Sequence, residues 1–190
     1  YMGTASTRQV MAEALGLAAP TSALAPANER YVLDQARQAG HLVMALLQHR
    51  LKTADILTEA SLRNAVVVHQ ATGGSSNALL HLPAMAAAAG LAFDVRLFDD
   101  LGQKTPYLTN LHSAGEYASR QFWYAGGVQR VIDLLAGSGL LQLDALTVTG
   151  KTLAENLQDV KRSDFFQAGE GYLSNYATRD GARRLRPVSY

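Results

Sequence analysis

Cysteine is absent from the 190-residue sequence. This excludes disulfide bonds, and it excludes a thiolate-bound cluster or a cysteine nucleophile built from this segment alone. No run of 18 apolar residues occurs, and the longest apolar stretches, 42–47 and 84–89, are too short to cross a bilayer. Charge is nearly balanced, with 17 basic against 16 acidic side chains, so no nucleic-acid partner is expected. The default expectation is a cytoplasmic protein.

The hydrophobic content of 48% is that of a globular protein, and the length suits one domain or part of a larger one. Apolar spacing, capping residues and glycine stops predict a mainly helical chain with two or three short strands. The expected helices span 7–15, 28–49, 58–72, 75–89, 94–102, 128–135 and 153–157, and the expected strands 106–111 and 146–149. Two strands are too few to form a sheet by themselves. We therefore predict an α/β fold class, with this chain as the helix-dominated portion of a three-layer α/β/α domain; a free-standing all-α domain is the alternative.

The most informative element is the corner Gly73-Gly74-Ser75-Ser76-Asn77, which separates two expected helices. Glycines let the backbone turn sharply and approach a ligand closely. A helix that starts after them presents N–H groups and a positive dipole end, which suit a carboxylate or phosphate. The same pattern also occurs as an ordinary well-capped corner, so the residues alone leave both interpretations open.

Other candidate residues have simpler structural interpretations. His81 follows Asn77 by four residues and is expected on the same side of its helix, as a packing residue. His41 and His49 are expected at the surface of the 28–49 helix, whose residues Leu33, Ala36, Gly40, Val43, Met44, Leu47 and Leu51 form an apolar stripe. The aromatic run 122–124 is expected in the core, and the basic cluster 179–186 in a solvated segment.

Several short motifs occur in the order found in one enzyme family. They are Met2-Gly3-Thr4-Ala5 followed by Glu13-Ala14-Leu15-Gly16-Leu17, Asn64-Ala65, the corner with Leu80-His81-Leu82, Ala125-Gly126-Gly127-Val128, and Val148-Thr149-Gly150-Lys151-Thr152-Leu153. As a set, they resemble the dehydratases that include dihydroxy-acid, phosphogluconate and aldonic-acid (xylonate, arabinonate) dehydratases, with Ser76 in place of the usual threonine. Residues 22–26 and Pro83 look most similar to the xylonate branch.

The resemblance implies an enzyme that removes water from a 2,3-dihydroxy (sugar) acid and gives a 2-keto acid. In such enzymes Mg²⁺ binds the substrate carboxylate and 2-hydroxyl, an iron–sulfur cluster acts as Lewis acid on the departing 3-hydroxyl, and a serine takes the proton. It also implies that residues 1–160 are part of the N-terminal α/β/α domain and that 161–190 form an irregular linker toward a missing C-terminal domain. A homodimer or homotetramer is the expected assembly of the complete enzyme.

None of the family's ligands or catalytic residues falls within this segment, since the nearest cluster cysteine is expected two positions before Tyr1. We therefore expect the segment alone to bind no cluster or Mg²⁺ and to have no activity. By the resemblance, it contributes Gly74, Ser75, Ser76 and Asn77 to the substrate pocket and Thr4 beside the cluster. Two alternatives stay open: a dihydroxy-acid or 6-phosphogluconate dehydratase of the same family, and a truncated, non-catalytic helical interaction module.

Overall fold

The computed structural model describes residues 1–179, in which the named elements are all helices, joined by turns and loops. Bridges between single residues pair Leu111 with Tyr117 and Leu146 with Thr152, and no longer strand forms within 1–179. The helix-dominated character predicted from sequence is therefore confirmed. The helices are α1 Thr4–Ala14, α2 Tyr31–Gln48, α3 Thr53–Ile56, α4 Glu59–Thr72, α5 Ala78–Ala88, α6 Leu97–Gly102, α7 Ser119–Tyr124, α8 Gly127–Leu135, α9 Leu153–Lys161 and α10 Asp164–Arg179.

The two strands expected from the sequence were wrong. In the first, Leu108 donates its N–H to the carbonyl of Ala71, at the end of α4, over 2.8 Å. In the second, the N–H of Val148 bonds to the carbonyl of Gly16, just beyond α1, also over 2.8 Å. Each segment therefore makes a backbone bond at a helix end, and the second segment also pairs locally, through Leu146 with Thr152. Neither segment has a neighbouring strand within residues 1–179.

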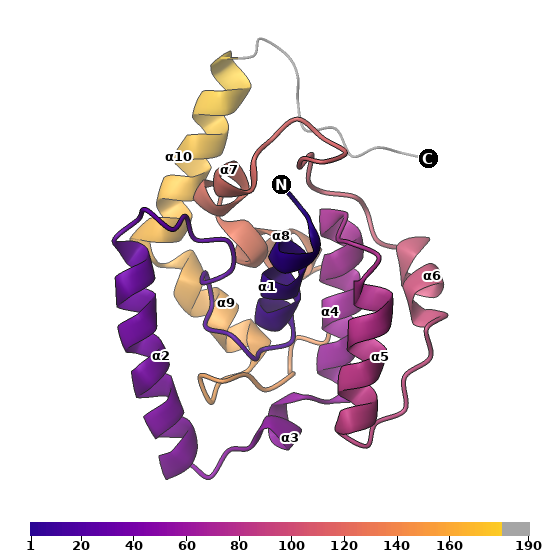
Figure 1. Cartoon of the computed structure of the whole chain (residues 1–190). Helices are drawn as coiled ribbons and strands as arrows, with labels where there is room; N and C mark the ends of the chain where they lie inside the picture. Colours follow the sequence, from indigo (N-terminus) through magenta and orange to yellow (C-terminus); the bar gives the residue numbers. More distant parts are fainter. Residues whose placement is uncertain (180–190) are drawn as a thin grey trace.

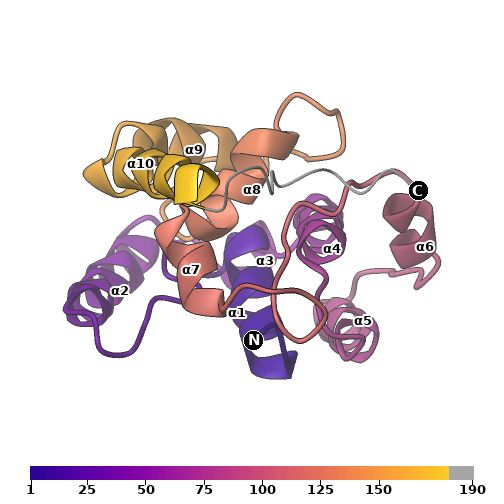
Figure 2. The same ribbon diagram turned by 90° about the horizontal axis from the view of Figure 1, so that it is seen from above.

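Helix α4 forms the centre of the core and packs against α1, α5, α6 and α8. Its residues Ala65, Val66, Val67 and Val68 are all fully buried, so every side of this helix turn is covered. Figures 1 and 2 show α1 between α2 on one side and α5 on the other, with α9 and α10 on the side of the molecule away from α5.

Local capping signals placed several helix ends correctly. Thr58 caps α4 by accepting the N–H of Ser61 over 3.3 Å, and Gly73 closes the helix with a positive φ of 63°. Thr152 caps α9 through a reciprocal pair with Glu155. The starts of three other helices were predicted about one turn away from their positions in the structure. Helices α1, α2 and α6 begin at residues 4, 31 and 97, whereas residues 7, 28 and 94 were expected.

The C-terminal part of the described chain corrects another expectation. Residues 164–179 form helix α10 and not the irregular segment predicted from sequence. The guanidinium of Arg130, on α8, lies 3.6 Å from the ring centre of Phe166 and donates to the carbonyl of Phe166 over 3.0 Å. This contact between distant residues has no local sequence signal. The expected linker residues 180–190, with Leu185-Arg186-Pro187 and most of the basic cluster, lie outside the described residues.

Two residues of the aromatic run on α7 lie in the core, as predicted, whereas Tyr124 is half-buried. Phe122 and Trp123 are buried, and the indole N–H of Trp123 donates to the carbonyl of Thr21 over 2.9 Å. His41 and His49 are exposed on α2, also as predicted. Within residues 1–179 no helix is both long and apolar enough to cross a membrane.

Asn64, on α4, holds a distant loop in place. Its amide donates to the carbonyl of Gln142 over 2.9 Å and accepts the N–H of the same residue over 2.7 Å. Asn64 is only 1% exposed, so a substitution leaves both backbone groups without water to replace the bonds. We expect Asn64→Leu to lower the free energy of unfolding by about 3 kcal/mol. Asn64→Asp should lower it as well, because it keeps the acceptor but sets a second carboxylate oxygen against the carbonyl of Gln142. Urea unfolding of the three proteins measures the difference, and equal stabilities would contradict this role.

Candidate functional site

The diglycine corner connects α4 to α5 and is shaped by the two glycines. Gly73 adopts the left-handed conformation, and Gly74 donates its N–H to the carbonyl of His69 over 3.0 Å. A Cβ atom on Gly74 would lie 2.3 Å from the imidazole carbon Cδ2 of His69 and 3.0 Å from the methyl group of Thr7. Only glycine fits at position 74, and the corner is consequently packed directly on α1.

Three hydrogen-bond contacts join this corner to the start of α1. Ser75 donates its N–H to the hydroxyl of Thr7 over 2.9 Å, and the Asn77 amide donates to the hydroxyl of Thr4 over 2.6 Å. The hydroxyls of Thr4 and Ser75 lie 3.4 Å apart. Residues far apart in the sequence therefore form one polar cluster, which contains Thr4, Ser75 and Asn77 of the predicted site.

The polar groups of this cluster lie at the surface of the described chain. Ser76 and Asn77 are exposed, whereas Thr4, Gly74 and Ser75 are half-buried. The N–H groups of Ala78, Leu79 and Leu80 bond to the carbonyls of residues 75–77 over 3.0–3.1 Å. The expectation that the helix start offers several free N–H groups was therefore wrong. The expected helix start at residue 75 was also wrong, because Asn77 is the N-cap residue. Side-chain hydroxyls and the Asn77 amide are the groups best placed to contact a ligand.

His69 supports the corner from inside the core, a role that the sequence did not reveal. Its Nε2 lies 3.0 Å from the carbonyl oxygen of Ser75, and its ring packs edge-on against Phe98 with 5.3 Å between ring centres. Burial lowers the pKa of His69, because desolvation disfavours the imidazolium. A neutral ring whose Nε2–H donates to Ser75 fits this position. The signal available in the sequence was a histidine one turn before the diglycine at the end of an apolar helix.

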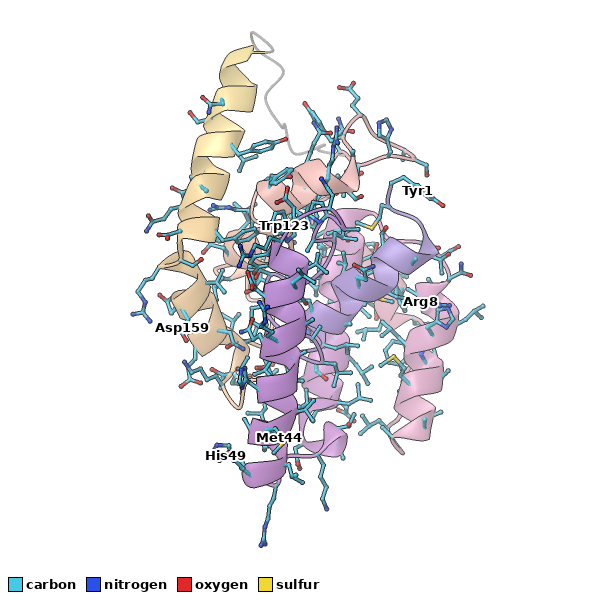
Figure 3. The ribbon with its side chains drawn as sticks, turned by 60° about the vertical axis from the view of Figure 1, so that its left-hand side comes forward. Tyr1, Arg8, Met44, His49, Trp123 and Asp159 are labelled. Carbon is cyan, nitrogen blue, oxygen red and sulfur yellow. The ribbon has the colours of Figure 1, made fainter. Side chains whose placement is uncertain are left out.

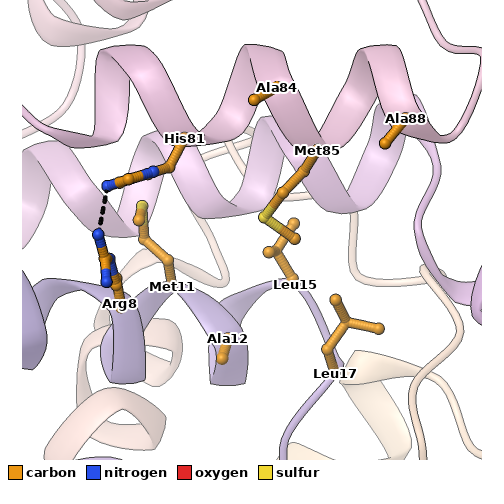
Figure 4. Close-up of a pocket in the computed structure, with 9 residues that line it drawn as sticks. All are labelled: Arg8, Met11, Ala12, Leu15, Leu17, His81, Ala84, Met85 and Ala88. Carbon is orange, nitrogen blue, oxygen red and sulfur yellow. Dashed lines mark hydrogen bonds between the residues drawn. The ribbon is translucent and has the colours of Figure 1, made fainter.

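A second contact joins α1 and α5 one turn further along. Arg8 and His81 meet with 2.7 Å between Nη2 and Nε2, just as Thr4 meets Asn77 four residues earlier on each helix. The pair stands at one end of a groove of about 450 Å³ (Figure 4). The groove is otherwise apolar and is lined by Arg8, Met11, Ala12, Leu15, Leu17, His81, Ala84, Met85 and Ala88. The sequence pattern had placed His81 beside Asn77 but gave no reason to single out Arg8.

The described residues do not supply a ligand set for either metal group that the family resemblance implies. Cysteine is absent from the chain, and residues 1–179 contain no group of three or more His, Asp or Glu side chains arranged to hold a metal ion. The polar cluster offers neutral hydroxyls and an amide, whereas magnesium and iron–sulfur sites are built mainly from carboxylates and thiolates. We therefore derive no chemical step through a metal from these residues.

Comparison with known proteins identifies the family of this chain. Residues 1–156 match the family model described as "Dihydroxy-acid/6-phosphogluconate dehydratase N-terminal". The chain therefore belongs to the dihydroxy-acid/6-phosphogluconate dehydratase family, as its motifs indicated.

Curated relatives from several bacteria are similar over most of this chain. A dihydroxy-acid dehydratase of Parvibaculum lavamentivorans is 46% identical over 158 residues, which are 83% of this chain and 27% of that protein. The D-xylonate dehydratase YagF of Escherichia coli is 45% identical over 161 residues, 83% of this chain and 25% of the relative. A dihydroxy-acid dehydratase of Caldicellulosiruptor saccharolyticus is 40% identical over 164 residues, 86% and 30% of the two chains. The chain thus spans less than a third of the length of these relatives.

Proposed function

We propose that this chain is part of a hydro-lyase that removes water from a 2,3-dihydroxy acid, a sugar acid, and releases a 2-keto-3-deoxy acid. The related proteins named above are dehydratases of dihydroxy acids and of xylonate, which share a carboxylate with hydroxyls on the two adjacent carbons. A dihydroxy-acid substrate is the second candidate, favoured by the names of two of those relatives. A 6-phosphogluconate substrate is the third, because the family's description names it. In this proposal the α1–α5 polar cluster forms one wall of the substrate pocket.

The observation that supports the proposal most strongly is the meeting of two family motifs. The Met2-Gly3-Thr4-Ala5 motif and the diglycine corner are far apart in sequence, and Thr4 contacts both Ser75 and Asn77. A merely structural corner needs no such set of short polar side chains directed toward one point at the surface. A sugar acid, rich in hydroxyls, is recognised by donors and acceptors of this kind.

The chemistry of the cluster assigns it to binding and orientation. Serine, threonine and asparagine side chains have no ordinary pKa near neutral pH. We therefore assign those of the polar cluster to holding the substrate, and leave proton transfer to the serine that the family resemblance places outside this segment. Orientation of this kind lowers the barrier because the reacting bonds are held in one geometry. His69 acts through Ser75, as a positioning residue below the pocket wall.

The rest of the catalytic machinery is assigned to the longer protein. In this proposal, the iron–sulfur cluster, the Mg²⁺ and their ligands belong to segments outside the present chain. The present chain alone therefore has no dehydratase activity. Helix α5 carries no charged residue, and its Leu80 is 69% exposed. An apolar helix of this kind is normally covered. This favours a larger three-layer α/β/α domain in which other segments supply the strands and cover α5.

The proposal predicts a loss of activity in the longer protein when side chains of the α1–α5 polar cluster are truncated. We expect Ser75→Ala and Asn77→Ala each to lower kcat/KM by roughly tenfold or more, because each removes a hydrogen bond to substrate that water does not replace. Formation of 2-keto acid is measured with aldonates, branched-chain dihydroxy acids and 6-phosphogluconate, alongside iron and labile-sulfide content. Asn28→Ala, at an exposed asparagine of the loop before α2, is the matched control.

Two outcomes separate the alternatives. Unchanged kinetics in both variants would remove the corner from the substrate pocket, whereas the preferred acid in the panel identifies the branch of the family. A longer reading frame that contains no cluster cysteine and yields no 2-keto acid would instead favour the non-catalytic helical module.

A further inference from the structure

The polar seam between α1 and α5 continues one turn beyond the cluster, at Arg8 and His81. Figure 3 shows Arg8 where α1 lies beside α5, and Figure 4 shows its guanidinium directed toward the imidazole of His81. Nη2 of Arg8 lies 2.7 Å from Nε2 of His81. Because a guanidinium only donates hydrogen bonds, Nε2 accepts this one and the imidazole is neutral, with its proton on Nδ1. His81 therefore fixes the direction of the guanidinium without neutralising its charge.

Arg8 keeps hydrogen-bonding capacity for a further group. A guanidinium carries five N–H donors, and the bond to His81 uses one of them. None of the ion pairs formed within residues 1–179 includes Arg8. Arg8 is exposed, whereas His81 is half-buried. An acceptor oxygen, above all one on an anionic group, is the partner that suits such a guanidinium.

The Arg8–His81 pair marks the point where the seam changes from polar to apolar. On one side, one helix turn or about 5.4 Å away, lie Thr4 and Asn77 of the polar cluster. On the other side the groove is lined by alanine, leucine and methionine side chains, among them Met11 and Met85. A molecule that extends along the seam from the polar cluster therefore meets Arg8 with its distal end.

The distance between the polar cluster and Arg8 fits the carbon chain of a sugar acid. Three consecutive covalent bonds in the extended form span about 3.8 Å, and a hydrogen bond adds about 2.9 Å, which together exceed one helix turn. With its reacting carbons held at the polar cluster, a five- or six-carbon aldonic acid brings the oxygens of its last carbons within reach of Arg8. A branched-chain dihydroxy acid has no oxygen at this distance from its reacting carbons.

We propose that Arg8, oriented by His81, is a specificity-determining residue that binds the distal oxygens of a sugar acid. This role rests on the function proposed above, in which the polar cluster holds the reacting end of the substrate. The same donors bind a hydroxyl group of a free aldonate or the phosphate of a phosphorylated one. An acid with an alkyl chain is disfavoured, because it desolvates the guanidinium and offers it no acceptor.

The test uses the longer protein with its iron–sulfur cluster and Mg²⁺, and compares gluconate with a branched-chain 2,3-dihydroxy acid. Arg8→Met keeps the apolar stem of the side chain and removes its donors. We expect it to lower the ratio of kcat/KM for gluconate to kcat/KM for the branched-chain acid at least about tenfold, because only gluconate loses a hydrogen bond from a charged group. Arg37→Met, the same substitution at an exposed arginine of α2, should keep the wild-type ratio.

A third substrate, 6-phosphogluconate, identifies the distal group. If Arg8 binds a phosphate, Arg8→Met should lower kcat/KM for 6-phosphogluconate at least about tenfold more than for gluconate, since a bond between two charged groups is the stronger one. Similar losses for the two acids assign the contact to a hydroxyl group. Either result supports recognition of distal oxygens by Arg8.

Two variants of His81 test its positioning role. His81→Leu removes the acceptor for Arg8, whereas His81→Gln offers a carbonyl oxygen in its place. We expect His81→Leu to lower the gluconate preference at least about threefold, mainly through KM, and His81→Gln to restore most of it. The same preference in both variants would refute the role of His81.

The outcomes separate this role of Arg8 from the pocket wall on which it rests. If Ser75→Ala and Asn77→Ala lower kcat/KM while Arg8→Met keeps the wild-type ratio, the wall stands and the role of Arg8 is wrong. Unchanged kinetics in Ser75→Ala and Asn77→Ala would remove the wall itself. An equal loss with all three acids in Arg8→Met would show a structural role and overturn the inference, as would a wild-type protein that prefers the branched-chain acid.

Discussion

We expect one titrating group to lower the free energy of unfolding by about 3 kcal/mol as the pH rises from about 4.5 to about 7. Glu13→Gln is expected to abolish this pH-dependent contribution. The source is the carboxyl group of Glu13, which is 2% exposed in the centre of the molecule. Burial raises its pKa from 4.5 to about 7, because desolvation disfavours the carboxylate more than its hydrogen bonds favour it.

The geometry explains why a carboxyl group is kept at this position. Its Oε1 accepts the N–H of Thr21 over 2.8 Å and the Gln129 amide over 2.8 Å, and its Oε2 accepts the N–H of Ala23 over 2.9 Å. Glu13 thereby fixes the loop after α1 against α8. Replacement by leucine would leave three buried donors without acceptors, and we expect that variant to lose about 4 kcal/mol or more.

The sign of the pH dependence follows from the raised pKa. The folded protein binds a proton on Glu13 more tightly than the unfolded chain does, so the contribution is fully present below pH 4.5 and is lost as the pH rises through about 7. The lowered pKa of His69 acts in the opposite direction, because the folded protein binds that proton less tightly than the unfolded chain. The difference between wild type and Glu13→Gln, measured by urea unfolding at several pH values, isolates Glu13. Glu59→Gln, at an exposed carboxylate, should keep the wild-type slope, and a wild-type slope in Glu13→Gln would refute the assignment.

Gly74→Ala is expected to destabilise the chain by about 2 kcal/mol and to lower the activity of the longer protein. The added methyl group overlaps the ring of His69, which must move away from the carbonyl of Ser75. The corner then shifts relative to Thr4 and Thr7, and the polar cluster loses its arrangement. Thermal unfolding measures the first effect, and kcat/KM measures the second.

Gly171→Ala is the matched control for this substitution. Gly171 lies inside α10, and a Cβ atom there would meet nothing within 4 Å. Since alanine favours the helix over glycine, we expect this variant to be more stable by about 0.5–1 kcal/mol and equally active. A Gly74→Ala protein as stable and as active as Gly171→Ala would show that position 74 tolerates a side chain.

The sequence predicted features that depend on neighbouring residues. The caps at Thr58 and Thr152 and the stop at Gly73 follow from hydrogen bonds within one helix turn, so local patterns were sufficient. The expected strands failed because strand formation depends on a partner. The residues at 108 and 148 found helix-end carbonyls to bond with. Helix α10 was not predicted because one of its stabilising contacts comes from Arg130, which lies 36 positions before Phe166 and donates to its carbonyl.

The sequence named residues of the candidate site but not their contacts. The motifs identified Thr4, Ser75 and Asn77, but their mutual contacts were not implied by any spacing in the chain. His69 and Arg8 were not recognised, because a histidine within an apolar helix and an arginine on a surface helix each have many ordinary roles. The apolar stripe of α2 was visible in the sequence, yet periodicity does not state which neighbour covers a helix face, and the structure leaves it outward.

The most direct test of the pocket wall is the position of a bound substrate in the longer protein. A crystal structure with a 2,3-dihydroxy acid, or a slowly reacting analogue, should place a carboxylate or hydroxyl oxygen within about 3.2 Å of a side-chain donor from Ser75, Ser76 or Asn77. A ligand bound at another surface, with the corner of α4 and α5 covered by apolar side chains, would contradict the central claim.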